Sequence, residues 1–324
     1  MDNTITRAVF MYMVNNTEAL AEYGEMNCWD VSQVTDMSWL FAHFDKIFEN
    51  YTDYTPFNED ISCWDMSNVN DTSAMFAYAT AFNQPIGNWS VSNVKDMAAM
   101  FEGASSFNQK IESWDVSNVK DTSFMFSGAS SFNQPLGGWS VSSVEDMSYM
   151  FEDASLFNQP IGSWMVSNVK NMAAMFEGAS SFDQPLGNWI VSNVEDMSGM
   201  FGDATSFNQP IGSWNVSSVK FMSGMFENAS SFNQPLGNWS VSSVVEMLYM
   251  FDEASSFNQN LCAWYDKLDN VTTVLEIEDY YDDDYYNDTV QIAFVESSLF
   301  NNSGCDIKVN PSATERTLFC QQCS

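Results

Sequence analysis

Residues 82–106 read FNQPIGNWSVSNVKDMAAMFEGASS, and close copies of this stretch fill most of the 324-residue chain. Its Trp89 belongs to a series of tryptophans that recurs every 25 residues from Trp64 to Trp264. A fixed period of this length is typical of proteins that stack one structural unit along an axis. We therefore expect an elongated solenoid in place of a globule.

Each repeat carries two different apolar periods. Trp89 and Val91 alternate with serines, which is the period of a β-strand. The following apolar residues fall at i, i+3, i+4 and i+7, the spacing of one helix face: Met97, Met100, Phe101 and Ala104. The pairs Ser142 with Glu145 and Ser192 with Glu195 match the capping box, so a short helix is expected to begin there.

The predicted fold is an α/β repeat solenoid that is leucine-rich-repeat-like, with a parallel β-sheet on one side, short helices on the other and capped ends. We divide the chain into an N-terminal cap (1–28), a solenoid (29–265) and a Cys-rich C-terminal cap (266–324). The spacing from Trp29 to Trp64 is ten residues longer than the repeat, which predicts an insertion at about 41–55. The C-terminal cap carries an acidic, Tyr-rich insertion, YYDDDYYND, at 280–288.

Charge excludes two classes of partner. The chain has 10 Lys and Arg against 43 Asp and Glu, giving a net charge of −33. Binding to nucleic acid or to an anionic membrane depends on Lys and Arg, so neither is an expected partner. No apolar run is long enough to cross a bilayer, and the N-terminus lacks a basic segment followed by an apolar one, so we expect no membrane insertion and no uncleaved signal peptide.

The repeat resembles a known family. The phrases NWSVSNVKDMAAMFEGASSFNQPL, FNEDISCWDMSNVNDTSAMF and FNQNLCAW are similar to the repeat of BspA-like surface proteins, over roughly residues 20–265. The end, NNSGCDIKVNPSATERTLFCQQC, resembles the Cys-rich tail of algal-type members. The resemblance implies a leucine-rich-like fold, found in mycoplasmal surface lipoproteins and algal secreted proteins, and a role in surface structure or adhesion. It implies no particular ligand.

All six cysteines lie near the ends of the repeat array, which indicates disulfides in an oxidising compartment. Cys28 and Cys63 each precede a tryptophan, so on adjacent turns they would lie within disulfide range of one another, and we expect them to pair. The remaining four allow three pairings that the sequence leaves open: Cys262, Cys305, Cys320 and Cys323. A zinc site or a redox pair formed by these late cysteines is less favoured.

Ten Asn-x-Ser/Thr motifs occur, and five of them lie in the caps or insertions, where N-glycans are expected: Asn15, Asn50, Asn270, Asn287 and Asn301. The loop residues Asp282, Asp283 and Asp284 form either a calcium site or, the interpretation that we favour, a solvated acidic loop. No catalytic motif is present, and His43 has no evident catalytic partner. We expect a non-enzymatic protein without cofactors other than N-glycans and, if the loop binds it, calcium.

One line of outward residues varies from repeat to repeat, whereas the predicted core does not. Its candidate ligand-binding members are Asp115, Ser140, Met165, Ile190 and Asn215. Two functions follow. The chain is a secreted or cell-surface structural and adhesive glycoprotein, or it is a soluble recognition module that binds an extracellular protein or glycan on this face.

Aromatic residues at both predicted ends suggest that the protein is also its own partner. They are Trp39, Phe41, Phe44 and Phe48 at one end and Tyr280, Tyr281, Tyr285 and Tyr286 at the other. A head-to-tail contact between unlike ends propagates into a filament. A monomeric or tethered protein, whose tyrosines pack the last turn, is the alternative.

Overall fold

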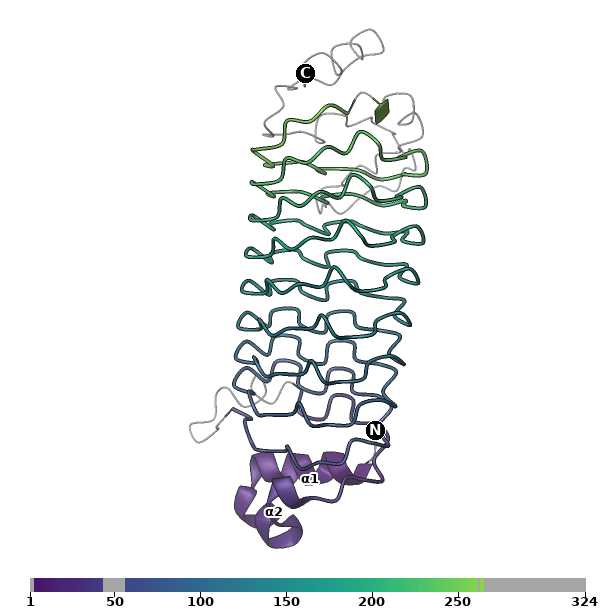
Figure 1. The fold of residues 1–324 in the computed structure, drawn as a ribbon. Coiled ribbons are helices and arrows are strands. Elements are labelled where there is room, and N and C mark those ends of the chain that lie inside the picture. The colour runs from purple at the N-terminus through teal and green to yellow at the C-terminus, as the bar shows by residue number, and fades with distance from the viewer. Residues whose placement is uncertain (1–2, 43–55, 262, 265–324) are drawn as a thin grey trace, which may run out of the picture.

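The computed structural model describes residues 3–42, 56–261 and 263–264. Within these ranges the repeats form a stack of irregular coils, one 25-residue repeat per coil, with two helices at the N-terminal end (Figure 1). We call this arrangement the coil stack. Residues at equivalent positions of successive coils form a column.

Helices α1 (Asn3–Val14) and α2 (Asn16–Tyr23) and the 3-10 helix η1 (Met26–Cys28) precede the first coil. The side chain of Asn15 caps α2 by accepting a hydrogen bond from the backbone N–H of Glu18. Tyr12 of α1 and Tyr23 of α2 both pack edge-on against Trp29, with ring centroids 5.9 and 6.0 Å away. The helices therefore cover the first tryptophan, which has no preceding coil to stack on.

Most neighbouring tryptophans of the coil stack pack ring on ring, as the period predicts. The rings of Trp89 and Trp114 are 6.4 Å apart and within 4° of parallel, and later pairs repeat this geometry. Each indole Nε1 also donates to a backbone carbonyl of the preceding coil, for example from Trp114 to Ile86 at 3.2 Å. The column thus combines aromatic burial with a satisfied polar group.

Two phenylalanine columns complete the core. Within one coil Phe101 and Phe107 stack at 3.9 Å, and each stacks on its counterpart in the next coil, at 5.7 Å for Phe126 and 5.9 Å for Phe132. The apolar residues of the described coils form one continuous buried cluster. Successive repeats contribute equivalent buried side chains to this core, with limited exchanges such as Ile111 to Leu136 and Met97 to Thr122.

The expected short helix at 97–104 is wrong. Alternate residues donate their backbone N–H to the next coil: Met97 to Asp121, Ala99 to Ser123, Phe101 to Met125 and Gly103 to Ser127. Between them, Met100 and Glu102 donate to the third preceding residue, and Ala98 donates to Asp96 Oδ1. Ala99 and Gly103 have φ of 56° and 65°, a left-handed conformation that no α-helix contains. Two consecutive tight turns therefore produce the helix-like spacing of buried side chains.

The capping boxes have a different role from the one expected. Glu145 accepts a hydrogen bond from Lys170 Nζ at 2.8 Å, and Glu195 accepts one from Lys220 Nζ at 2.6 Å. Both lysines belong to the next coil, so the two glutamates link coils to one another and start no helix.

The expected parallel β-sheet is also wrong for the described residues, which contain no strand. Neighbouring coils share one isolated parallel bridge each, from Asp36 with Asp71 to Phe221 with Glu246. Backbone carbonyls that a sheet would pair with a neighbouring strand accept hydrogen bonds from side chains of the next coil. The Ile61 oxygen accepts from Trp89 Nε1, and the Ser67 oxygen accepts from Asn93 Nδ2 at 2.7 Å. The leucine-rich-like architecture of a sheet opposed by helices is therefore replaced by a stack of hydrogen-bonded turns.

An asparagine column ties the return loops together. The Oδ1 of Asn83 accepts the backbone N–H of Asn108 at 3.0 Å and Gln109 Nε2 at 3.0 Å. Asp183 continues the column with a carboxylate oxygen in place of the amide, accepting from the N–H of Asn208 at 3.0 Å. These asparagines bond adjacent coils and have a structural role.

Candidate interaction surface

The predicted ligand-binding column lies on the outside of the coil stack, although no sheet carries it. Trp164 and Val166 are buried, whereas Met165 between them is 63% exposed. Ile190, in the next coil, is 62% exposed. Asp115, Ser140 and Asn215 are exposed as well. The structure thus brings the five candidates into one column.

Some members of this column serve the fold. Asp115 Oδ1 accepts the backbone N–H of Ser117 at 3.1 Å, and Asn215 Oδ1 accepts that of Ser217 at 3.2 Å. The hydrogen bonds from the Ser117 hydroxyl and backbone N–H hold the pKa of Asp115 below its usual value. Met165 and Ile190 have no side-chain polar group for such a turn, so they form an apolar step in an otherwise polar column.

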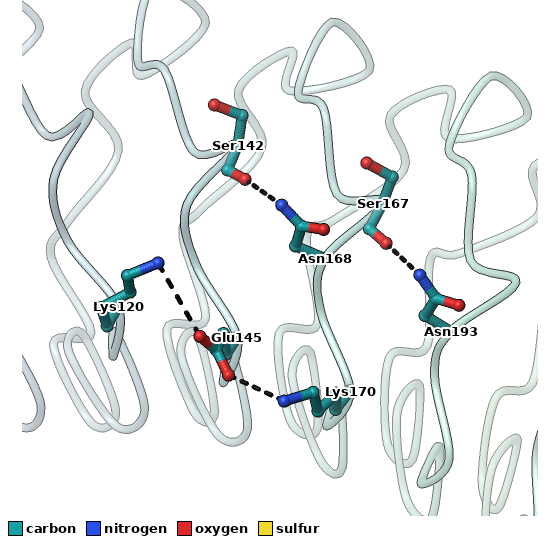
Figure 2. Close-up of polar contacts among 7 residues, drawn as sticks. All are labelled: Lys120, Ser142, Glu145, Ser167, Asn168, Lys170 and Asn193. Atoms are coloured by element: carbon teal, nitrogen blue, oxygen red, sulfur yellow. Dashed lines mark hydrogen bonds and ion pairs between the residues drawn. The ribbon is translucent and has the colours of Figure 1, made fainter.

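A polar border runs beside this column. Asn168 Nδ2 donates to the backbone oxygen of Ser142, and Asn193 Nδ2 to that of Ser167, each at 2.7 Å (Figure 2). These contacts fix the spacing between the coils that carry the apolar step.

Oppositely charged residues alternate along the next column. Glu145 lies 3.7 Å from Lys120 and 2.8 Å from Lys170, as Figure 2 shows. The hydrogen bond from Lys170, together with the charges of Lys170 and Lys120, lowers the pKa of Glu145. Because these side chains are about half exposed, solvent screens each pair and its contribution to stability is small. The lysines therefore partly neutralise this side of the molecule.

A pair of stacked aromatic rings, which the sequence did not predict, lies on the segment that follows the bridge residue of each coil. Phe124 and Tyr149 stack on the surface with ring centroids 4.4 Å apart and planes within 4°. We call this pair the aromatic step. Beside it runs an acidic edge, formed by the carboxylates Glu152, Asp153, Glu177, Asp203, Glu227 and Asp252. A signal exists in the sequence: two neighbouring aromatic residues interrupt a column that is Ala or Gly at most other positions.

Burial and mutual repulsion change the titration of the acidic edge. Burial, followed by the charges of Glu152, Asp203, Asp153 and Glu227, raises the pKa of Glu177 to about 7. Burial is also the main cause of the raised pKa values of Glu152 and Glu227. The edge is therefore a concentration of carboxylates that repel each other.

The predicted cysteine and calcium sites fall largely outside the described residues. The thiol of Cys63 is exposed and free, and its backbone N–H donates to Asn27 Oδ1 at 3.2 Å. The side chain of Cys28 is not among those described, so its pairing with Cys63 stays a prediction. Outside the described ranges lie Cys262, Cys305, Cys320, Cys323, Asp282, Asp283 and Asp284.

One predicted glycan site can be placed. Asn15 is exposed, but its side chain caps α2 and its Nδ2 donates to Glu18 Oε2 at 2.8 Å. The other four lie outside the described ranges: Asn50, Asn270, Asn287 and Asn301.

The described residues contain neither a cluster of metal-binding side chains nor a membrane-spanning helix. No group of three or more His, Cys, Asp or Glu side chains there is placed to hold a metal ion. No helix in the same ranges is both long and apolar enough to cross a membrane.

The sequence matches one family model, described as Mycoplasma protein of unknown function, DUF285, over residues 4–97, 42–164 and 184–284. These matches overlap and together span well over half of the chain, and they follow the repeats that build the coil stack. No curated protein matches the sequence. From the extent of the family match, the chain belongs to the DUF285 repeat family.

Proposed function

We propose that this DUF285 member is a non-enzymatic structural and adhesive protein of an extracellular surface, of the BspA-like kind. The observation that carries the proposal is the contrast between columns. The core and ladder columns change little, with exchanges such as Ile111 to Leu136, whereas the outward column varies in polarity and presents Met165 and Ile190 more than 60% exposed. An exposed apolar pair with no structural role supports contact with a partner.

The described coils also support a scaffold. Polar side chains of several columns are committed to holding neighbouring coils or turns, such as Asp121, whose Oδ1 accepts both the N–H and the hydroxyl of Ser123. Such side chains are held in place by the fold and give the outward column a fixed spacing. A repeat family match is consistent with a surface repeat protein. The net charge of −33 favours solubility in a surface layer.

Localisation tests the surface assignment. Intact cells of the source organism would be treated with protease and, separately, labelled with gold-coupled antibody for electron microscopy. We expect the chain to be cleaved from intact cells and the label to lie at the cell boundary or in secreted material. Labelling confined to the cytoplasm, with full protection from protease, would contradict the proposal.

The same micrographs separate the alternatives. A coat or fibres support the structural and adhesive role, and dispersed single molecules support a soluble recognition module that binds a protein or glycan. End-to-end assembly also stays a prediction. Phe41 is fully buried against Phe57 and Phe76, whereas Trp39 is 52% exposed; Phe44 and Phe48 lie outside the described residues.

Adhesion through the outward column has its own test. Beads coated with the purified chain would be captured on surfaces of immobilised extracellular proteins or glycans. Met165→Ser combined with Ile190→Ser, which introduces the residue native at Ser140, should abolish capture. Ser140→Asn, which introduces the residue native at Asn215, is the matched control and should retain it. Equal capture by both variants would show that another surface mediates adhesion.

A further inference from the structure

The column that contains the aromatic step is built for small residues. Its members have left-handed φ values between 52° and 62°, a conformation that glycine adopts freely and bulky side chains rarely adopt. The column runs Ala74, Ala99, Phe124, Tyr149, Ala174, Gly199, Gly224 and Tyr249. Alanine and glycine fill most positions, so the fold does not require the aromatic pair at Phe124 and Tyr149.

After Tyr149 the side chains of the column become smaller: Ala174 has only a methyl group, and Gly199 has no side chain. The Glu177 carboxylate lies over these small residues, because its Oε2 is 2.9 Å from the position that a Cβ on Gly199 would occupy. The ring of Tyr149 therefore borders a region that contains small residues and an acidic group.

Carboxylates act on the Tyr149 phenol through their charge. Burial is the main cause of the raised pKa of Tyr149, and the charges of Glu177, Glu152 and Asp196 raise it further. Glu152 is anchored by the Ser127 hydroxyl, which donates to its Oε2 at 2.8 Å. An anchored carboxylate and an aromatic face thus lie on the same part of the surface.

The chain does not neutralise this charge within the described residues. Every charged group that acts on Glu152, Glu177 and Glu227 is another carboxylate. The lysines of the described coils that form ion pairs do so with Glu145 and Glu195, in a different column. Among the described residues the edge therefore keeps its negative charge, and a cationic partner would complement it.

We propose that the surface formed by Phe124, Tyr149, Glu152 and Glu177 binds an arginine-rich or lysine-rich segment of a partner protein. One cationic side chain of the partner stacks on the half-buried aromatic step, and its charge lies between the two glutamates. Aromatic faces attract guanidinium and ammonium groups, and carboxylates bind guanidinium through two parallel hydrogen bonds.

Charge and shape both favour this occupant. A divalent metal requires converging ligands, and the described residues contain no cluster of that kind. A planar organic cation instead uses the ring and the carboxylates together. This surface lies in a different column from Met165 and Ile190, so its partner does not depend on the proposed adhesive function.

The test measures binding of a short alternating Arg–Gly peptide to the purified full chain by calorimetry, at about 0.15 M ionic strength and about pH 8. Tyr149→Ala should weaken binding about two- to fivefold, the size of one exposed cation–π contact. The fold should tolerate this change, because alanine is native at Ala174 in the same column. Glu177→Gln should weaken binding as well.

Two controls separate specific docking from attraction to net charge. Glu145→Gln removes one carboxylate from the ion-paired column and should leave peptide affinity nearly unchanged, as should Met165→Ser. Equal weakening by Glu145→Gln and Glu177→Gln, or no effect of Tyr149→Ala, would overturn the proposal. A titration with calcium alone that gives Glu177-dependent heat, without peptide binding, would overturn it in favour of a metal site.

Discussion

The indole Nε1 of Trp139 donates a 3.1 Å hydrogen bond to the backbone carbonyl oxygen of Ile111 in the preceding coil. Trp139 is also stacked on Trp164 at 6.4 Å and is only 4% exposed. One side chain therefore joins three successive coils.

Trp139→Ala should lower the free energy of unfolding by about 3–5 kcal/mol, because it leaves a cavity in the tryptophan column. Trp139→Phe keeps a ring but removes one of two donors to the Ile111 carbonyl, which still accepts from the Trp114 N–H at 3.0 Å, so the cost should be smaller, about 0.5–1.5 kcal/mol for the lost hydrogen bond. Thermal and denaturant unfolding would measure both variants. Ser140→Ala, at the exposed neighbouring position, is the control. An unchanged transition for Trp139→Ala would contradict the stacked core.

Replacing a glycine by alanine should destabilise the coil stack more where the backbone of the next coil lies closer. A Cβ on Gly162 would lie 2.4 Å from the Pro185 carbonyl oxygen, whereas one on Gly137 would lie 3.1 Å from that of Pro160. Gly162→Ala should therefore destabilise the stack by about 1–3 kcal/mol and Gly137→Ala by less. Denaturant midpoints of the two variants make the comparison. The opposite order would show that the coil spacing differs from that described.

The coil stack should become more stable as the pH falls from about 8 to about 5. The pKa of Glu177 is raised from 4.5 in the unfolded chain to about 7, so between these values the folded state binds more protons. Stability therefore decreases as the pH rises through this window. The charges that act on Glu177 are those of Glu152 and Asp153 in the preceding coil, Asp203 in the next coil and Glu227 in the coil after that.

Melting temperatures from about pH 5 to about pH 8 measure this dependence. Glu177→Gln removes the titrating group and should flatten the curve. Glu145→Gln should not flatten it, because its ion pairs with lysine lower the pKa of Glu145. A wild-type curve that rises with pH across this window would contradict the interpretation.

Peptide mapping under non-reducing conditions tests the predicted Cys28–Cys63 disulfide in native protein. The two segments are neighbours, because the Cys63 N–H bonds to Asn27 and the Trp64 indole bonds to the Met26 carbonyl at 2.9 Å. We expect a linked peptide and a lower melting temperature after reduction. Free thiols at both Cys28 and Cys63 in secreted material would contradict the predicted disulfide.

The sequence predicted which residues are buried better than it predicted the backbone that buries them. The period of the tryptophans and the alternation at Met165 follow from side-chain chemistry, and both are confirmed. The helix at 97–104 was wrong because two tight turns can bury the same positions that a helix face buries. Gly103, Gly128 and Asp153 at one register were a signal for left-handed turns within that segment.

The strand was wrong for a related reason. The alternation at Trp89 and Val91 indicates which side chains face the core. It does not indicate which group donates a hydrogen bond to each backbone carbonyl. Here the indole and asparagine side chains of the next coil take those bonds. The aromatic step and acidic edge were missed because Tyr149 and Glu177 lie 28 positions apart in sequence and meet only when the coils stack.

The asparagine column has a mechanical consequence. Each coil is held to its neighbour by the same short set of contacts, including the bond from the Asn108 N–H to Asn83 Oδ1. A force applied to the ends of the chain would load these boundaries one after another. The protein would extend in steps as single 25-residue coils detach, each releasing up to ~80–90 Å of chain. Stretched in this way, the molecule is an extensible spring that lengthens by uniform increments, and its contour length scales with the number of coils.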